Sequence, residues 1–294
     1  MVNQSNGETP SVLMVDGMAL LFRAFFATSW GGAVKKNREG VPVNAVHGFL
    51  RILGDAVRRI KPTHLVCCWD LAGGSFRAEH FPEYKGNRPE APDDLIPQFE
   101  LIKTVTESFG ILNVSAEGYE ADDCIGTLAR RFAQQSEVFI LTGDHDLLQL
   151  VDERISVMIM KKGAGNYAVY TPAFLLEERN LTAAQIIDLK GLMGDTSDNY
   201  PGVRGIGEKT ALKLIQEFAS IDGILSNMEN LPAAVRKKIE ADLDMLHLSR
   251  SLATINCEAP LNVELSHCTW IVDRDRVTAI CEKVEFKDAL RWIG

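Results

Sequence analysis

Residues 137–146 read EVFILTGDHD, a run of six strand-forming residues followed at once by a glycine and two aspartates. Two earlier stretches have the same plan, SVLMVD at 11–16 and THLVCCWD at 63–70. Short apolar runs that are rich in valine and isoleucine are typical of buried parallel strands. Each of these three runs ends at an aspartate, so the strands are expected to carry acidic groups at their carboxyl ends.

Helical and extended patterns alternate along the first part of the chain. Helices are expected at 18–26, 44–60, 94–109 and 121–133. Further strands are expected at 112–114, 155–160 and 167–170, the last two as a hairpin. From about residue 182 the pattern is helical with glycine-rich turns. This order predicts an α/β fold with a central, mostly parallel sheet flanked by helices at 1–181, followed by a helical domain at 182–294.

Composition limits the class of protein. No apolar run approaches the roughly 20 residues that a membrane span needs, and the first ten residues lack a signal-peptide pattern, so we expect a cytoplasmic location. The six cysteines include no C-x-x-C pair, which argues against a zinc site. A net charge of −9 argues against nucleic-acid binding unless many of the acids lie in one metal site.

The acids are expected to converge on one edge of the sheet. Ligands of open parallel sheets bind just beyond the carboxyl ends of the strands. Three further acids open the helix at 121–133, where the helix dipole favours negative charge, and two more, three residues apart, would share one face of a helical turn. The complete set is Asp16, Asp70, Glu120, Asp122, Asp123, Asp144, Asp146, Asp195 and Asp198.

Carboxylates that are packed together repel one another and need compensating charge. Oxygen ligands without histidine or cysteine favour hard cations such as Mg²⁺ or Mn²⁺. Two such ions about 4 Å apart are a common arrangement for phosphodiester hydrolysis. Any one of these aspartates alone is more often a cap or turn residue, but four such groups in one topology favour the metal site.

Six segments together resemble the 5′-nuclease family, which includes the exonuclease domain of bacterial DNA polymerase I and the flap endonucleases. They are VDGMALLFRAFFA, FRAEHFPEYKGNR, EGYEADDCIGTLA, LTGDHDLLQLV, LMGDTSDNYPGVRGIGEKTA and VEFKDAL, and they extend from about residue 12 to 291. The resemblance implies a PIN-like or resolvase-like nuclease core, two metal ions held by the nine acids, and a stand-alone bacterial 5′→3′ exonuclease without a polymerase domain.

The segment at about 71–100 resembles the arch through which a 5′ single strand passes. Its basic and aromatic residues suit phosphate contact and base stacking. The resemblance places Lys85 and Arg88 at the scissile phosphate as catalytic residues, and Arg23 at another phosphate. The mix of basic and aromatic residues adds Arg77 and Tyr84 as expected DNA contacts. The alternative is a solvated loop whose aromatic residues only pack.

Residues 202–209 resemble the hairpin of a helix–three-turn–helix, which grips duplex DNA and often holds a monovalent cation such as K⁺. Glycines let backbone N–H groups approach a phosphate closely. The expected DNA contacts are Gly202, Arg204, Gly205, Gly207, Lys209 and Lys213. Many relatives have proline where Arg204 stands, so Arg204 is either a turn variant or a phosphate contact. Glu208 before Lys209 excludes a P-loop.

The expected function is that of a metal-dependent 5′→3′ exonuclease and flap endonuclease. Its substrates would be DNA with 5′ flaps, 5′ ends or nicks, together with RNA primer–DNA hybrids, and it would act as a monomer. One alternative is a catalytically inactive protein that binds branched DNA, which the complete acid set disfavours. Another is a PIN-type ribonuclease, which the arch and the glycine hairpin disfavour.

Overall fold

A six-stranded sheet forms the centre of the molecule in a computed structural model that describes residues 9–29, 34–163 and 165–287. The strands lie in the order β3-β2-β1-β4-β5-β6, and all pairs are parallel except β5 with β6. The bounds are β1 (Ser11–Asp16), β2 (His64–Cys68), β3 (Leu112–Val114), β4 (Glu137–Thr142), β5 (Ile155–Met160) and β6 (Tyr167–Tyr170). The expected mostly parallel sheet is confirmed.

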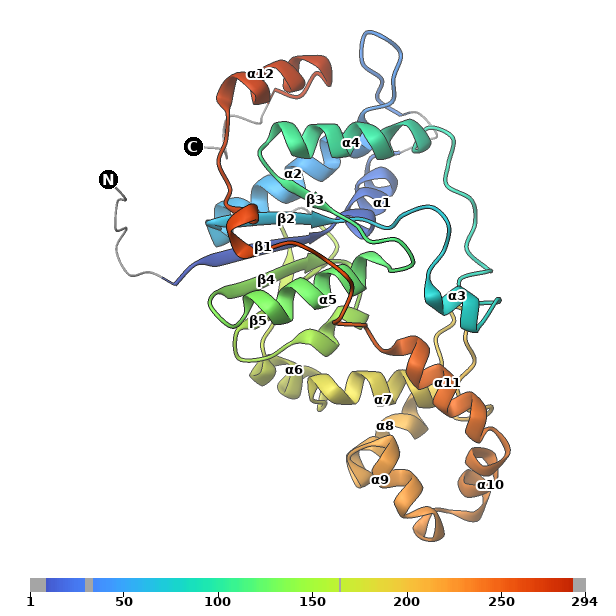
Figure 1. The fold of residues 1–294 in the computed structure, drawn as a ribbon. Coiled ribbons are helices and arrows are strands. Elements are labelled where there is room, and N and C mark those ends of the chain that lie inside the picture. The colour runs from blue at the N-terminus through green and yellow to red at the C-terminus, as the bar shows by residue number, and fades with distance from the viewer. Residues whose placement is uncertain (1–8, 30–33, 164, 288–294) are drawn as a thin grey trace.

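Helices cover both faces of this sheet (Figure 1). One layer contains α1 (Gly17–Thr28), α2 (Asn44–Ile60), α4 (Ile96–Ser108) and α12 (Arg274–Lys283), and the other contains α5 (Ala121–Phe132) with the 3-10 helix η2 (Asp146–Leu150). Side chains alternate across a strand. Leu13 and Val15 of β1 therefore pack in the first layer, and Val12 and Met14 pack in the second.

A separate group of helices follows the sheet (Figure 1). It contains α7 (Ala183–Met193), α8 (Glu208–Phe218), α9 (Ile221–Ser226), η3 (Met228–Asn230), α10 (Ala233–Ala241) and α11 (Leu243–Ala253). An additional helix, α6 (Pro172–Arg179), joins it to the sheet. We did not expect α6, although Thr171 caps it by accepting a hydrogen bond from Phe174 N and Pro172 occupies its first turn.

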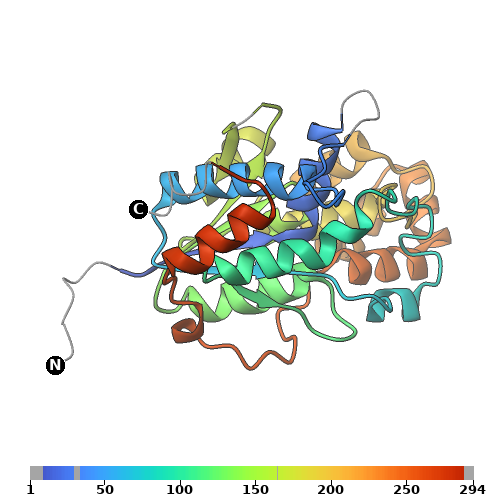
Figure 2. The ribbon, with the colours of Figure 1, turned by 90° about the horizontal axis from the view of Figure 1, so that it is seen from above.

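Within the described residues the helical group ends at α11, whereas the sequence predicted a helical domain over 182–294. After α11 the chain returns along the sheet through η4 (Leu265–Cys268), and α12 packs beside α4 (Figure 2). The reason is apolar burial, because Val277 and Ile280 of α12 share one core with Ile102 and Val105 of α4. Residues 288–294, the end of the expected domain and of its VEFKDAL segment, lie outside the described residues.

The strand order creates a crevice at the carboxyl edge of the sheet. From β1 the chain builds outward to β2 and β3 on one side, whereas β4 and β5 lie on the other side. The connections that leave β1 and β4 therefore diverge, which opens a gap where ligands bind in sheets of this kind. No helix of the described part of the chain is long and apolar enough to cross a membrane.

Candidate active site

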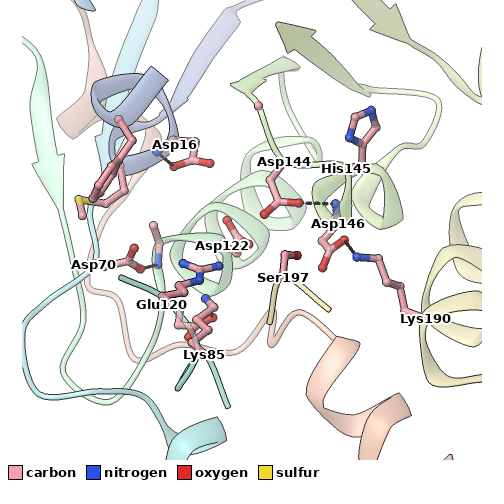
Figure 3. A pocket seen from close by; sticks show the side chains of 16 residues that line it. Asp16, Asp70, Lys85, Glu120, Asp122, Asp144, His145, Asp146, Lys190 and Ser197 are labelled. Carbon is pink, nitrogen blue, oxygen red and sulfur yellow. Dashed lines mark hydrogen bonds and ion pairs between the residues drawn. The ribbon is translucent and has the colours of Figure 1, made fainter. Parts of the chain in front are cut away.

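A pocket of about 550 Å³ opens at this edge of the sheet (Figure 3). Acids from the ends of three strands and from the start of α5 surround it. The acids that line it are Asp16, Asp70, Glu120, Asp122, Asp144 and Asp146, and the cations are Lys85, Arg88 and Lys190. Six of the nine expected acids are thus brought together, by elements that are far apart in the sequence.

Local hydrogen bonds hold the acids at the strand ends. Asp16 caps α1 by accepting from Ala19 N at 2.9 Å, and it also accepts from Thr142 Oγ1 at 2.7 Å. Asp70 accepts from Ala121 N at 2.7 Å and so ties the end of β2 to the start of α5. The strand ends and helix starts therefore set the positions of these carboxylates.

The pocket disfavours ionised carboxylates. Burial raises the pKa of Asp16 to about 7, and the nearby charges of Asp70 and Asp144 add to the effect. Burial and the charge of Asp144 likewise raise the pKa of Asp146 to about 7. The pKa of Asp122 lies well above its ordinary value because of burial and then the charge of Asp144. Such a site gains free energy from any added positive charge.

Oxygen-only donors in this number fit a hard divalent cation. Nevertheless, among the described residues no three acidic, histidine or cysteine side chains are gathered closely enough to hold one ion as they stand. The carboxylates instead accept hydrogen bonds from backbone N–H groups, from Thr142 and from Lys190. Metal binding would therefore need side-chain rotations within the pocket.

Two cations of the arch segment face these acids. Lys85 Nζ lies 3.0 Å from Glu120 Oε2. Burial alone would lower the pKa of Lys85, but the carboxylates of Glu120 and Asp198 outweigh burial and raise it. Arg88 Nη2 lies 2.7 Å from Asp198 Oδ1. Both side chains are positively charged and line the acidic pocket.

The sequence did not indicate Lys190. Its ammonium lies 2.7 Å from Asp146 Oδ1 and also donates to Asp195 Oδ2. Lys190 stands in the last turn of α7, where a cation is favoured by the helix dipole. This position, shortly before Gly194, Asp195 and Asp198, was the feature of the sequence that could have indicated a role for Lys190 among the acids.

Asp195 and Asp198 do not share a helical face, so that expectation is wrong. They stand in a turn in which Asp195 Oδ1 accepts from Ser197 N at 2.7 Å and from Ser197 Oγ at 2.5 Å. Neither residue is among the described residues that line the pocket. They act on it indirectly, because their partners Lys190 and Arg88 do line it.

Asp123, expected as a metal ligand, and Arg77, expected as a DNA contact, are not among the described residues that line the pocket. Asp123 is fully buried and Arg77 is 2% exposed, and the two side chains form an ion pair with each other. The helical twist turns Asp123 to the side of α5 away from its neighbour Asp122, which lines the pocket. No DNA phosphate could reach Arg77 in this arrangement.

Tyr84 is likewise unable to stack on a base in this structure. It is 7% exposed, and its ring packs on Tyr200 with a centroid distance of 6.4 Å. Its hydroxyl donates to Glu120 Oε2 or to Asp198 Oδ2, at 3.2 and 3.1 Å. The expected DNA contact is therefore a packing residue, because the arch segment closes onto the turn at 195–200.

That closure is made by several hydrogen bonds. Lys85 N donates to Asp198 O at 2.9 Å, Asn87 Nδ2 to Thr196 O at 2.8 Å, and Asn199 Nδ2 to Glu83 O at 2.7 Å. The only helix of the described arch residues before α4 is the short α3 (Phe76–His80). The expected long irregular segment is present, but it is docked on the helical group.

The glycine hairpin at 202–209 contains both buried and exposed residues. Gly202 is buried, has a φ of +63°, and donates its N–H to Ser249 Oγ, so it is a packing residue and not a phosphate contact. Gly205 and Gly207 are exposed, and Gly207 is the N-cap residue of α8, which has no side-chain cap. Lys209 and Lys213 are exposed one turn apart on α8.

The remaining two expected contacts have partners within the chain. Arg204 is exposed, and its backbone N–H donates to Asp242 Oδ2 at 2.8 Å. Arg23 is partly buried on α1, and its guanidinium donates to Lys161 O in the β5–β6 hairpin. Neither observation assigns a DNA contact to these residues.

Comparison with known proteins identifies this arrangement. A family model described as the N-terminal resolvase-like domain of 5′-3′ exonucleases matches residues 11–180, and one described as their C-terminal SAM fold matches residues 181–275. A 5′-3′ exonuclease of Bacillus subtilis (strain 168) is 47% identical over 282 residues, which are 96% of this chain and 95% of that protein. The chain belongs to the 5′-3′ exonuclease family. It is therefore a hydrolase.

Two further proteins, one a longer polymerase and one a solved structure, are similar to this member of the 5′-3′ exonuclease family. DNA polymerase I of Lactococcus lactis subsp. lactis (strain IL1403) is 43% identical over 86% of this chain, which spans only 29% of that protein. The fold also matches the bacteriophage T5 flap endonuclease in a pseudo-enzyme–product complex with DNA and metal ions, with a TM-score of 0.65, 22% identity, and coverage of 94% of this chain and 98% of that chain. The resemblance that the motifs indicated is confirmed.

Proposed function

We propose that this 5′-3′ exonuclease hydrolyses phosphodiester bonds at 5′ ends, nicks and 5′ flaps of DNA, and in RNA primer–DNA hybrids, with two Mg²⁺ or Mn²⁺ ions. The observation that carries the proposal is one pocket in which buried carboxylates with raised pKa values face Lys85 and Arg88. The T5 flap endonuclease complex, which contains DNA and metal ions, supports it.

The proposed metal ligands are the six acids of the pocket. Bound divalent ions would activate the attacking water and stabilise the leaving oxygen. The acids form two groups, because Asp144 and Asp146 follow β4 whereas Asp16, Asp70, Glu120 and Asp122 lie around β1, β2 and α5. Asp195 would join the group of Asp144 and Asp146 only if Lys190, which pairs with both Asp146 and Asp195, released it.

The proposed role of Lys85 and Arg88 is to bind the scissile phosphate and to stabilise the charge that develops on it. Their carboxylate partners raise the pKa of both groups despite burial, so both stay protonated at neutral pH. A phosphate that enters the pocket would replace Asp198 as the partner of Arg88. The acids at 195–198 would thereby hold the cations ready until the substrate arrives.

The proposed duplex contact is the exposed start of α8. Uncapped N–H groups at Gly207 and the ammonium groups of Lys209 and Lys213 suit backbone phosphates. We also propose that a K⁺ ion binds at this hairpin. Lys238 Nζ donates to Gly205 O at 2.8 Å, so Lys238 would have to move away before that carbonyl could bind K⁺. We propose that the protein acts as a monomer with two functional parts. Residues 1–181 would form the catalytic part, and a helical part that starts at residue 182 would bind the duplex.

A cleavage assay on a 5′-labelled DNA flap tests the proposal. We expect cleavage with Mg²⁺ and none with excess EDTA. Asp144→Ala should lower the rate by about 100-fold or more while the flap is still bound, because the ligand contributes to the transition state and not to duplex affinity. Full cleavage in EDTA would refute metal dependence.

The same assay separates the alternatives. A catalytically inactive binding protein would bind the flap and cleave nothing at any Mg²⁺ concentration. A PIN-type ribonuclease would cleave an RNA strand of the same shape and leave the DNA flap intact. The unchanged protein, an all-DNA flap and an all-RNA flap are therefore sufficient to decide between them.

A further inference from the structure

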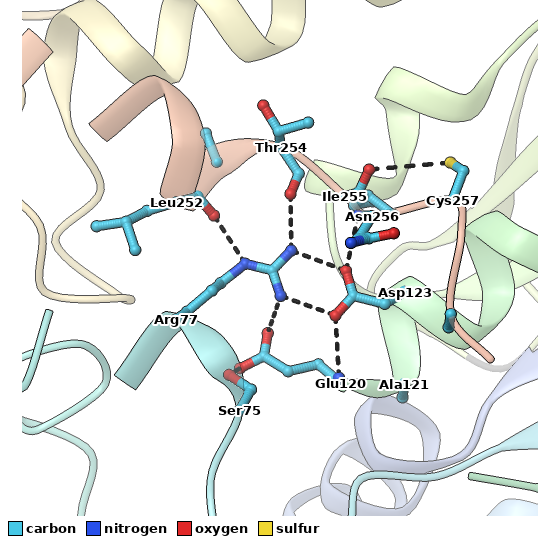
Figure 4. A network of polar contacts seen from close by, with 12 residues as sticks. Ser75, Arg77, Glu120, Ala121, Asp123, Leu252, Thr254, Ile255, Asn256 and Cys257 are labelled. Carbon is cyan, nitrogen blue, oxygen red and sulfur yellow. Dashed lines mark hydrogen bonds and ion pairs between the residues drawn. The ribbon is translucent and has the colours of Figure 1, made fainter. Parts of the chain in front are cut away.

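Arg77 and Asp123 form a buried ion pair beside the pocket (Figure 4). Arg77 Nη1 and Nη2 each donate to a different oxygen of Asp123 at 2.8 Å. Arg77 Nε also donates to Leu252 O at 2.9 Å, and Nη2 to Thr254 O at 2.7 Å. The guanidinium thus joins α3 and α5 to the last turn of α11 and to Thr254, which follows it.

Glu120 links this pair to the pocket. On one side Arg77 Nη1 lies 3.4 Å from Glu120 Oε2, Ser75 Oγ donates to Oε1 at 3.0 Å, and Glu120 N donates to Asp123 Oδ2 at 3.0 Å. On the other side Lys85 Nζ lies 3.0 Å from Oε2. Both the backbone and the carboxylate of Glu120 are therefore oriented by the buried pair.

The pair is not explained by stability alone. Burying two charges costs desolvation free energy, and apolar residues of similar volume often stabilise a core equally well. A bidentate Arg–carboxylate pair differs from apolar packing because it fixes directions. Asp123 has no free acceptor direction left for a metal, since its oxygens also accept from Glu120 N and from Asn256 N at 2.8 Å.

We propose that Arg77 and Asp123 are positioning residues that hold the Glu120 carboxylate in the pocket, and that residues 252–256 complete this arrangement from the helical part. The inference rests on the proposed function, in which Glu120 is a metal ligand. It assigns to Arg77 and Asp123 no contact with DNA or metal. Outer groups of this kind orient ligands, and their loss typically lowers metal affinity or activity.

Asp123→Asn is the sharpest test. Every partner of the Asp123 oxygens is a donor, so the amide NH₂ must face another donor and the geometry around Glu120 is lost. We expect Mn²⁺ binding, measured by titration of the free protein, to weaken by about 10- to 100-fold, and the single-turnover rate on a flap to fall by a similar factor. Flap affinity in EDTA should change little.

Ile125→Val is the matched control. Ile125 is fully buried on the same helix and belongs to the apolar core, so its truncation lowers stability without touching the polar network. The unfolding midpoints of both variants are measured first. At a comparable loss of stability, Ile125→Val should retain the Mn²⁺ affinity of the unchanged protein.

A second variant guards against failure to fold. Arg77→Lys keeps the charge but cannot make the bidentate contact, so it should weaken Mn²⁺ binding in the same direction. The positioning role is overturned if Asp123→Asn or Arg77→Lys folds and binds Mn²⁺ as tightly as Ile125→Val does. It is also overturned if neither Asp123→Asn nor Arg77→Lys folds, because the pair is then needed for stability. Absence of Mn²⁺ binding and of flap cleavage in the unchanged protein would instead overturn the proposed function, and the inference with it.

Discussion

Lys190 Nζ lies 2.7 Å from Asp146 Oδ1 inside the acidic pocket, with side-chain exposures of 19% and 13%. Burial alone would lower the pKa of Lys190, but the carboxylate of Asp146 and then that of Asp195 outweigh burial and raise it. The ammonium therefore supplies positive charge to a site that is otherwise rich in carboxylates. A divalent ion bound nearby would supply the same compensation.

Replacing Lys190 by methionine should make stability depend on metal. In EDTA we expect a loss of about 3 kcal/mol in the free energy of unfolding, because a largely buried pair loses one partner. In saturating Mg²⁺ the loss should shrink, because the ion offsets the charge of Asp146 and Asp195. Urea denaturation under both conditions measures the difference.

Lys103→Met is the control for this comparison. Lys103 pairs with Glu100 on the exposed side of α4, where the glutamate side chain is 83% exposed. Its removal should change stability by less than about 1 kcal/mol with or without Mg²⁺. An equal loss for Lys190→Met in EDTA and in Mg²⁺ would contradict the compensating role of the ammonium.

The raised pKa values predict an unusual pH dependence in the absence of metal. Burial raises the pKa of Asp16 from its ordinary value of 3.8 to about 7 in the native protein. Between these values the native state binds more protons than the unfolded state, so stability falls as pH rises. Asp16 contributes at most about 1.4 kcal/mol per pH unit across that window.

Urea denaturation in EDTA at several pH values between about 5 and 8 tests whether the free energy of unfolding falls as pH rises. Buried His47 and partly buried His64 act in the opposite direction, because desolvation lowers their pKa. The informative quantity is therefore the difference in slope between the unchanged protein and Asp16→Asn, whose slope should be flatter. Identical slopes would show that Asp16 titrates normally, and added Mg²⁺ should reduce the slope of the unchanged protein.

Lys85→Met should separate chemistry from binding. Lys85 lies beside Glu120 in the pocket, and its charge is expected to act most strongly in the transition state. The single-turnover rate on a flap should fall by about 100-fold, and the flap dissociation constant in EDTA should rise by much less. If rate and affinity fall by the same factor, Lys85 only tethers the DNA.

The ends of the strands could be predicted from the sequence with good accuracy. The expected bounds 112–114, 137–142, 155–160 and 167–170 coincide with β3, β4, β5 and β6. Each run is apolar and is bounded by turn-forming or charged residues, so local pattern and tertiary burial agree. The convergence of Asp16, Asp70 and Asp144 follows from the parallel topology alone.

The roles of neighbouring residues could not be predicted in the same way. Asp122 and Asp123 are adjacent acids at the start of one helix, yet only Asp122 lines the pocket. Asp123 turns toward Arg77, and the carbonyl groups that complete this contact come from residues 252 and 254, about 130 positions later. The stacking of Tyr84 on Tyr200 depends in the same way on contacts far apart in the sequence.

The start of α8 offers the cleanest test of duplex binding. Gly207 has a φ of −95°, which any residue adopts, and a Cβ built there would meet no atom within 4 Å. Gly207→Val should therefore fold normally and obstruct only a phosphate that approaches the free N–H groups. We expect affinity for flapped duplex to fall by about tenfold, roughly 1.4 kcal/mol, while short single strands lose much less.

Two side-chain variants complete this test of the hairpin. Lys209→Ala should weaken binding to all duplex sequences alike and lower the slope of log K against log salt by about one. Arg204→Ala is preferable to a proline at this position, because the N–H of Arg204 holds Asp242 and must be kept. Lower affinity of Arg204→Ala at low salt would assign Arg204 to a phosphate, and unchanged affinity would make it a turn variant.

If Gly207→Val binds flapped duplex as the unchanged protein does, the hairpin is only a connector between α7 and α8, and the duplex must bind elsewhere.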